Sequence, residues 1–352
     1  MGFRRSVGAT TKGVFAVSDF FIDYLSVRQY HGEGVPEYVG TLLFSLDKDG
    51  AVQSESARGV KVEGSYCSKL FIKSHLGTVT VTGNPSRWDR ADNLFGFDLD
   101  DCMTIVNRVL AQLHLPPFTE GKPFRPKSTM TTVQKLHALP DWTGARFSVL
   151  HLTRNMVAGS DFLAKLAIRS YGARAGAYMR KAVYGDETVM FHNTHRAIKA
   201  YRKGPDMAKH CPESPWREWA LSQGVVRQEV ELKSRYLSDT KLSFWGNCNM
   251  ARLYKLFEHE TEVLRRPDAS LDPMALEACP SRSRVVYAAW LKGQDVRAML
   301  PRATFYRHRK TLLEYDVDIA EVRHCGDVVP MVREVVLAPA AAPAGYWDRA
   351  AA

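Results

Sequence analysis

The order of apolar and polar positions predicts a β-rich first third of the chain. Short runs of β-branched and aromatic residues follow one another between residues 13 and 82, among them Phe20–Val27 and Tyr38–Leu46. Further along, Cys67–His75 and Gly77–Gly83 alternate like the two strands of a hairpin. We therefore expect a sheet in this part of the chain.

A helix and a linker should follow these strands. Residues 98–115 carry apolar side chains at helical spacing, and the pair Pro116–Pro117 ends the pattern. The stretch 117–130 is rich in proline, which is typical of a linker. Region 1–130 is accordingly predicted to be β-rich with one helix.

Region 131–262 shows elements in the order β, α, β, β, α, β. They are a strand at 147–153, a basic helix at 160–182, strands at 187–191 and 197–201, a helical turn at 215–221 and a long strand at 225–237. Because side chains alternate between the two faces of a strand, one face of the long strand should carry only charge. The residues on that face are Arg227, Glu229, Glu231 and Lys233.

Region 263–352 is predicted to be helical and to bind DNA. Three short helices are expected at 285–291, 295–300 and 305–315, a helix–turn–helix spacing in which Thr304 would be the N-cap of the third helix. Residues 282–310 hold eight basic residues against one acidic residue. The alternative is a small helical cap with a solvated basic face. The whole pattern predicts an α+β fold with a mixed or antiparallel sheet.

The composition limits the classes of function. The 352 residues carry a net charge of +10 at pH 7, and 45% of them are hydrophobic. This balance excludes disordered, collagen-like and disulfide-scaffold proteins, and it makes a polyanion, nucleic acid first, the expected partner. No apolar run approaches the ~20 residues of a spanning helix, and no signal-peptide core is present, so we expect a cytosolic protein without a membrane partner. Six widely spaced cysteines fit reduced thiols in that compartment.

Tyr201 is the candidate nucleophile. A phenol with a pKa near ~10 is a poor nucleophile unless cations lower that pKa or a metal activates the electrophile. Lys199, Arg202 and Lys203 supply cations beside it, and a phosphodiester is the electrophile that such cations attract. The alternative is an ordinary strand tyrosine packed at a sheet edge. The sequence has no phosphate-binding loop of the kind that ATPases use, which argues against ATP hydrolysis.

A metal site is the second candidate feature. Glu229 and Glu231 share one face of the long strand, and His151 lies in the middle of another strand with Thr153 on the same face. Oxygen ligands together with one imidazole suit Mg²⁺ or Mn²⁺, either of which polarises a phosphoryl oxygen. The alternatives are cross-strand ion pairs of the two glutamates and a hydrogen-bonded core histidine.

Several segments match a known family, and they do so in the same order. They are Asn84-Pro-Ser-Arg87 with Asp92–Gly96; Val149–Thr153; Glu187–Phe191 with His195-Arg196 and Ala200-Tyr-Arg-Lys203; Val226–Leu237; and Leu300–Arg307 with Asp327–Arg333. In amino-acid sequence and in order they resemble segments of the replication initiators of filamentous bacteriophages, the gene II protein family. Because the matches are colinear over most of the chain, chance is a poor explanation.

The resemblance implies an enzyme that nicks and rejoins DNA, with a catalytic core of the rolling-circle initiator type. At the position of Tyr201, the family tyrosine attacks the plus-strand origin and becomes linked to the 5′ end. Lys203 matches a family lysine and would stabilise phosphoryl charge. Glu229 matches a family glutamate and could hold Mg²⁺, whereas His151 stands in place of a family aspartate.

The resemblance also implies partners and a place of action. These are double-stranded origin DNA, single-stranded phage DNA, and the host polymerase and helicase, all in the cytoplasm of a bacterial host. The residues expected to contact DNA are Arg196, Lys199 and Arg202 near the tyrosine, and Arg302, Arg307, Arg309 and Lys310 in the tail.

A second hypothesis is a phage repressor or copy-control protein that binds DNA through residues 282–333 and has no enzymatic activity. The two hypotheses differ in geometry. An enzyme needs Tyr201, His151 and Glu229 to converge within one basic cleft, whereas a regulator does not.

Overall fold

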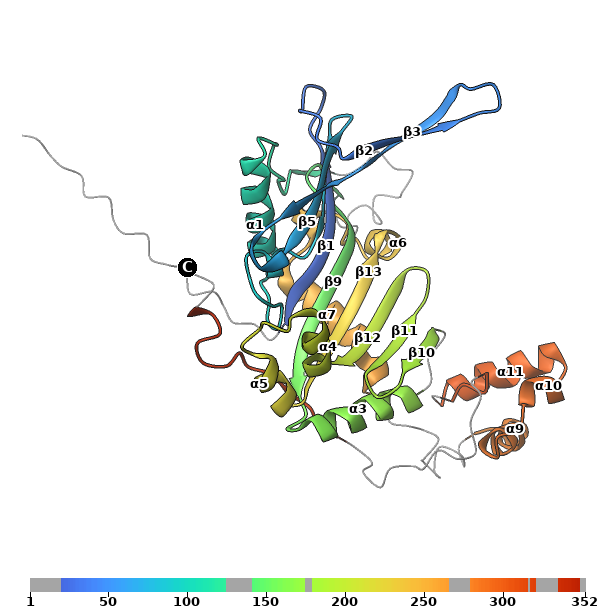
Figure 1. Cartoon of the computed structure of the whole chain (residues 1–352). Helices are drawn as coiled ribbons and strands as arrows, with labels where there is room; N and C mark the ends of the chain where they lie inside the picture. Colours follow the sequence, from blue (N-terminus) through green and yellow to red (C-terminus); the bar gives the residue numbers. More distant parts are fainter. Residues whose placement is uncertain are drawn as a thin grey trace, which may run out of the picture.

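The computed structural model of the chain describes residues 20–124, 141–174, 179–265, 279–315, 317–320 and 335–348. Within them, ten strands form one antiparallel sheet with the order β10-β11-β12-β13-β9-β1-β6-β5-β4, and β14 pairs with the end of β9 (Figure 1). The strands are β1 (Phe20–Tyr30), β4 (Val60–Glu63), β5 (Lys69–His75), β6 (Thr78–Gly83), β9 (Arg146–Val157), β10 (Arg180–Tyr184), β11 (Thr188–His192), β12 (Arg196–Arg202), β13 (Val225–Lys233) and β14 (Ala338–Pro339). The predicted α+β class is confirmed.

Helices lie around the sheet and in the tail. They are α1 (Leu99–Gln112), α3 (Asp161–Ala173), α4 (Lys203–His210), α5 (Arg217–Ser222), α6 (Ser234–Asp239), α7 (Met250–Glu260), α9 (Ser281–Leu291), α10 (Val296–Met299) and α11 (Arg302–Leu313). Single turns of 3₁₀-helix occur at η1 (Ser65–Cys67), η2 (Pro85–Arg87), η3 (Trp245–Asn247) and η4 (Thr261–Leu264). The predicted helix at 98–115 is confirmed as α1, and Asp98 caps it by accepting the Asp101 N–H at 2.8 Å.

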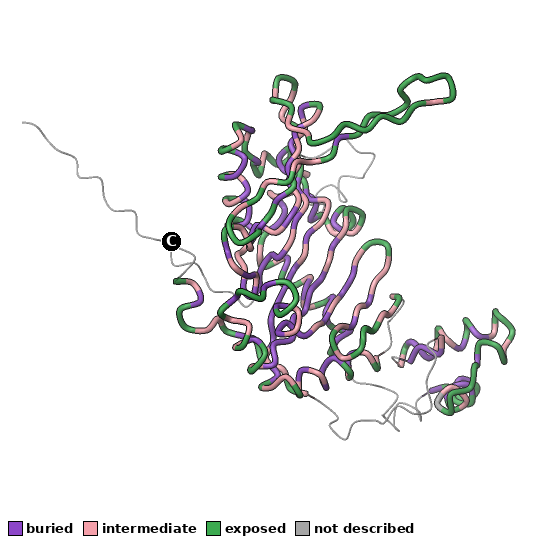
Figure 2. Tube along the Cα trace, viewed as in Figure 1, coloured by how far each residue is buried: buried purple, intermediate pink, exposed green. Residues whose placement is uncertain are grey.

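The main core lies on one face of the sheet. Alternate residues of the central strands, such as Leu150, Leu152 and Val230, are fully buried there. They pack against apolar side chains of α1, α3 and α7, while exposed residues gather at the periphery (Figure 2). The alternation predicted along β13 therefore separates its side chains onto two faces, as expected. The apolar set of this strand enters the core, and the charged set points to the opposite face.

The sheet crosses the predicted boundary at residue 130. Strand β1 pairs with β6 on one side and with β9 on the other, so strands from 1–130 and 131–262 are hydrogen-bonded into one sheet. The start of the predicted linker is packed as well. Phe118 is 2% exposed, and its backbone N–H and C=O bond to the Asn107 side chain at 2.8 and 2.9 Å. Residues 125–130 of that linker lie outside the described residues, as do residues 13–19 of the expected β-rich region.

Two short hairpins stand beside the large sheet. Strand β2 (Thr41–Leu46) pairs with β3 (Val52–Arg58), and this arm projects away from the rest of the molecule (Figure 1). The turn at 47–50, which contains Gly50 at φ 82°, closes the arm. Strand β7 (Pro123–Phe124) pairs with β8 (Asp141–Trp142).

Three expectations about element boundaries are wrong. The helix expected at 160–182 ends at Ala173, because the backbone of residues 180–184 pairs with β11 across the turn at Gly185. The strand expected at 225–237 ends at Lys233, and residues 234–239 form α6 instead. Thr304 is not an N-cap, since α11 already begins at Arg302 after Pro301.

The tail forms a small helical unit with its own core. The three expected helices are confirmed as α9, α10 and α11. Their buried apolar residues, among them Val286, Val296, Phe305 and Leu312, form a cluster separate from the main core. No helix within the described ranges is both long and apolar enough to cross a membrane.

Candidate active site

Tyr201 and Glu229 meet on the charged face of the sheet. Tyr201 comes from β12 and Glu229 from the neighbouring strand β13, whose register places Glu229 opposite Lys199, two residues before the tyrosine. The phenolic hydroxyl of Tyr201 donates a hydrogen bond of 2.6 Å to Oε1 of Glu229. The side chain of Glu229 is buried, and that of Tyr201 is half-buried. The candidate nucleophile therefore has a carboxylate as its direct partner.

The surroundings keep Tyr201 protonated at neutral pH. Burial and the nearby Glu229 carboxylate raise the pKa of Tyr201 well above its usual value near ~10, and Arg227 opposes them only in part. Phenolate formation consequently needs a base that accepts the proton as the oxygen reacts. Glu229 already holds that proton in a hydrogen bond.

Lys203 provides a fixed positive charge next to the tyrosine. Its side chain is 2% exposed, and its Nζ donates to Oδ2 of Asp206 at 2.7 Å and to Oδ1 of Asn93 at 3.0 Å. The same Nζ lies 5.9 Å from the centroid of the Tyr201 ring. Burial alone would raise the pKa of Asp206, but Lys203 outweighs it, so the pKa falls below its usual range.

Arg227 is the centre of a buried polar network beneath the site. Its side chain is 0% exposed, and its guanidinium donates to Oδ1 of Asn155 at 2.9 Å. It also donates to the carbonyl oxygens of Asn93 and Leu94 at 2.5 and 2.7 Å. Its Nη1 lies 3.8 Å from Oδ1 of Asp23. A buried charge of this kind is tolerated only when it is paired and hydrogen-bonded.

Asp23 connects this network to the segment around residue 90. Its Oδ1 accepts hydrogen bonds from the amides of Asn84 at 2.9 Å and Asn93 at 2.8 Å. Asn93 thereby bridges Asp23 and Lys203. A bulge between Ile22 and Tyr24 shifts the register of β1 against β9 at the position of Asp23.

Several of these residues were not among our predicted site residues. Asp206, Asn155 and Arg227 were assigned no role, although Arg227 was placed on the charged face. Asn84 and Asn93 lie within segments that carried the family resemblance, again without a role. For Asp23 the available signal was one carboxylate within the otherwise apolar stretch 20–25. Buried charges of this sort are exceptions that need a partner.

The predicted metal ligands lie on the same face as Tyr201, but ion pairs already occupy them in part. His151 Nε2 lies 4.0 Å from Oε2 of Glu231, which also pairs with Lys199 at 3.3 Å. Lys233 lies 3.4 Å from the other oxygen of Glu231, so the alternative of an ion pair is realised for this glutamate. Burial lowers the pKa of His151, and the imidazole is therefore neutral at pH 7.

The donor chemistry at this place suits a divalent cation. Across the strand pair β9–β13, Thr153 lies opposite Glu229, and its buried hydroxyl has no hydrogen-bond partner within the described chain. Two carboxylates, an imidazole and a hydroxyl are a set that Mg²⁺ or Mn²⁺ accepts. No group of three or more His, Cys, Asp or Glu in the described ranges is gathered closely enough to form a ready-made site. The metal stays a prediction.

The predicted DNA-binding cations fall into two groups. Four of them pair with carboxylates: Arg196 with Glu260 at 3.0 Å, Lys199 with Glu231 at 3.3 Å, Arg202 with Asp161 at 3.1 Å, and Arg309 with Asp318 at 2.6 Å. The other three, Arg302, Arg307 and Lys310, are exposed on α11. Of the three residues that an enzyme was expected to bring together, Tyr201 and Glu229 are hydrogen-bonded, and His151 lies on the same face of the sheet.

Comparisons with known proteins identify the family of the chain. Residues 21–251 match the family model of the replication-associated protein G2P N-terminal region, and residues 278–351 match that of its C-terminal region. The chain is 29% identical to the replication-associated protein G2P of Enterobacteria phage I2-2 over 89% of its length and 92% of the relative's. It is 27% identical to the protein of the same name from Escherichia phage If1, over 76% of its length and 93% of the relative's. The chain belongs to the replication-associated protein G2P family.

Proposed function

We propose that this protein starts rolling-circle replication of a filamentous phage by nicking one strand of the double-stranded origin. The observation that carries this proposal is the 2.6 Å hydrogen bond from the Tyr201 hydroxyl to Glu229. It joins a nucleophile to a base within a site that also holds a buried cation, Lys203. The relatives' names, replication-associated protein, support the proposal.

In the proposed reaction, the Tyr201 oxygen attacks a phosphorus of the DNA backbone. Its proton passes to Glu229, a Tyr–O–P bond forms, and the bond from phosphorus to the 3′ oxygen breaks. The protein is then linked to the 5′ end, and the leaving oxygen takes a proton from solvent to become a 3′-OH. Lys203 supplies positive charge beside the reacting group, where negative charge develops on the phosphoryl oxygens.

The reverse reaction rejoins the displaced strand. A phosphotyrosine bond conserves the energy of the phosphodiester, so ligation needs no nucleotide. This agrees with the lack of a phosphate-binding loop in the sequence. A 3′-OH attacks the phosphotyrosine and loses its proton to solvent, the Tyr–O–P bond breaks, Glu229 returns its proton to the Tyr201 oxygen, and a circular strand is released.

We also propose that Mg²⁺ or Mn²⁺ takes part. His151, Glu229 and Glu231 are the residues that would hold the cation, and the Tyr201 hydrogen bond uses only Oε1 of Glu229. When bound, the cation would polarise a non-bridging oxygen of the scissile phosphate. Lys199, which pairs with Glu231, would have to leave that carboxylate.

The remaining partners follow from the same proposal. Origin duplex would be held by the exposed cations Arg302, Arg307 and Lys310 of α11, since lysine and arginine contacts to phosphate position a protein on DNA. Single-stranded phage DNA is the product that is rejoined. The host polymerase and helicase would extend and unwind the nicked template in the bacterial cytoplasm.

The deciding experiment uses supercoiled plasmid that carries the phage origin. The wild type should relax it in the presence of Mg²⁺ or Mn²⁺ and remain attached to a 5′ end, whereas Tyr201→Phe should bind the plasmid and do neither. A Tyr201→Phe variant that still relaxes the plasmid and forms the adduct would remove Tyr201 from its role. Duplex binding without metal-dependent nicking by the wild type would instead support the repressor or copy-control hypothesis.

A further inference from the structure

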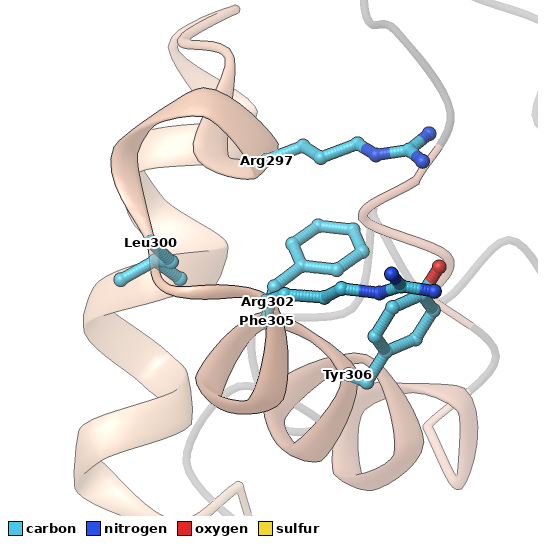
Figure 3. A pocket seen from close by; sticks show the side chains of 5 residues that line it. All are labelled: Arg297, Leu300, Arg302, Phe305 and Tyr306. Carbon is cyan, nitrogen blue, oxygen red and sulfur yellow. The ribbon is translucent and has the colours of Figure 1, made fainter.

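A cavity opens in the helical tail where α10 passes into α11. Its volume is about 370 Å³, and its lining side chains are Arg297, Leu300, Arg302, Phe305 and Tyr306 (Figure 3). This volume lies at the small end of the range of small-molecule sites, roughly 300–1,000 Å³. A single nucleotide unit is a ligand of suitable size.

Two arginines give the cavity a positive rim. Arg297 and Arg302 are exposed, and their guanidinium groups extend to the same side of the helices (Figure 3). Neither guanidinium forms an ion pair or a hydrogen bond with another residue in the part of the chain that the structure describes. The nearest carboxylate in sequence, Asp295, caps α10 by accepting the backbone N–H groups of Arg297 and Ala298 at 3.1 Å. Planar guanidinium groups bind phosphate in a bidentate manner, so this rim suits a phosphate.

The start of α11 adds to the same preference. Pro301 stands at its N-cap position and offers no side-chain acceptor to the first turn of the helix. The free N–H groups of that turn, at Arg302–Thr304, lie beside the rim, and they favour a negative charge.

Leu300 and two aromatic rings form the rest of the cavity. Phe305 is 2% exposed and belongs to the core of the tail, whereas Tyr306 is 43% exposed. The two rings meet edge to face, with centroids 5.4 Å apart at an angle of 80°. Because Phe305 contacts Tyr306 in this manner, a face of the Tyr306 ring is left for a ligand. An exposed aromatic face beside arginines is typical of sites where DNA bases stack.

We propose that this cavity binds one unpaired nucleotide of a DNA strand. Arg297 and Arg302 hold its phosphate, and its base stacks on Tyr306. The nucleotide must be unpaired, because both faces of a paired base are covered by its neighbours in the duplex. The choice of DNA as the ligand rests on the proposed function. In that setting the cavity would hold a base of the melted origin.

The test compares the binding of three fluorescent DNA probes to the full-length protein by anisotropy. One probe is a duplex with a single unpaired thymine, the second has an abasic residue at that position, and the third is fully paired. Base–aromatic stacking is worth enough to expect about 5-fold to 150-fold tighter binding of the thymine probe than of the abasic probe. Tyr306→Ala should bring this ratio to about 1, whereas Tyr306→Phe should preserve it.

Two further variants separate the parts of the site. Arg302→Ala should weaken binding of the thymine and abasic probes by the same factor, because both retain the phosphate. Tyr30→Ala removes a tyrosine that is 65% exposed at the end of β1 and should leave every probe unchanged. If Tyr306→Ala fails to fold, equal affinity of the wild type for the thymine and abasic probes still overturns the inference.

Three results would overturn the inference. They are equal wild-type affinity for the thymine and abasic probes, a ratio that Tyr306→Ala preserves, and competition by a free deoxynucleoside monophosphate as strong as that by the thymine probe. The nicking reaction is measured separately with supercoiled plasmid. If the protein nicks the plasmid but does not discriminate between the thymine and abasic probes, only the proposal for the cavity is refuted. If it discriminates between the probes but does not nick, only the proposed nicking activity is refuted.

Discussion

Replacing Glu229 with glutamine removes the charge and the basicity of this side chain but keeps its shape. Glutamine has nearly the same size, and its amide oxygen can still accept the Tyr201 hydroxyl at the 2.6 Å position of Oε1. Glu229 is 6% exposed, so no solvent base can easily replace it beside the tyrosine. The variant should fold and bind DNA like the wild type, but it cannot take the proton of Tyr201.

The expected loss of nicking rate follows from the contribution that a general base makes to catalysis. Positioned acid–base groups contribute about 10²- to 10⁴-fold in rate, which corresponds to about 3–5.5 kcal/mol of barrier. The pH dependence gives a second signature. The Glu229 carboxylate helps to raise the pKa of Tyr201, so its removal lets the phenol ionise at lower pH than in the wild type. Nicking by Glu229→Gln should therefore recover as the pH rises, and the gap to the wild type should narrow.

The assay is single-turnover nicking of supercoiled origin plasmid at saturating protein over a range of pH, with affinity for the plasmid measured separately. The matched control is Glu218→Gln on α5, whose carboxylate is 73% exposed and pairs with Arg217. It should nick at the wild-type rate. If Glu229→Gln nicks within about twofold of the wild type at neutral pH, the role of Glu229 as the base is refuted, because a base is worth at least about a hundredfold.

Three more predictions concern stability and metal binding. Arg227→Met should lower the free energy of unfolding in urea by about 3–5 kcal/mol, because it leaves Asp23 and the Asn93 and Leu94 carbonyls without their buried partner. Asp206→Asn should be less stable than the wild type at neutral pH, but its free energy of unfolding should fall less than that of the wild type on acidification. Lys203 holds the pKa of Asp206 below the unfolded value near ~3.9, so this contribution is present above that value and lost as the pH falls through the folded pKa. His151→Ala should weaken Mn²⁺ binding, measured by calorimetry, about tenfold or more.

Exposed residues of the same types provide controls. Arg235→Met and Asp239→Asn alter a surface pair on α6 whose side chains are 72% and 59% exposed, and each should change stability by less than about 0.5 kcal/mol. His259→Ala removes a histidine that is 71% exposed and should leave Mn²⁺ affinity unchanged. A stability loss for Arg227→Met no larger than that for Arg235→Met would contradict the buried network. If the free energy of unfolding of Asp206→Asn fell as steeply with decreasing pH as that of the wild type, the ion pair with Lys203 would be contradicted. If His151→Ala retained the wild-type affinity for Mn²⁺, this histidine would not belong to the metal site.

The buried network gives the G2P family resemblance a structural explanation. The segments around Asn84 and Asn93 match the family although they lie far from Tyr201 in the sequence. In the fold, both amides bind Asp23, and Asn93 also binds Lys203. These segments therefore hold Lys203 and, through Arg227, the start of β13 in place. In the proposed reaction, such supporting contacts would keep Lys203 within the positional tolerance that catalysis requires.

The sequence by itself determined several of the elements and which of their faces are apolar or charged. Alternation along residues 225–233 predicted which side chains of β13 are apolar and which are charged, because this property depends only on the pleat of one strand. Helical spacing predicted α1 and the three helices of the tail for the same local reason. The colinear motifs placed Tyr201 and Glu229 in adjacent roles, but no local pattern placed their atoms in contact.

Tertiary structure decided which charges meet. Strand register made Glu229 the hydrogen-bond acceptor of the Tyr201 hydroxyl, whereas Glu231, two residues further along the same face, pairs with Lys199 and Lys233. The bulge in β1 placed Asp23 under Arg227, although the two lie more than 200 residues apart. Register and bulges are set by packing of the whole sheet against its helices, so they depend on residues distant in sequence. The helix expected at 160–182 was wrong for this reason, since pairing with β11 overrode the local preference of residues 180–182.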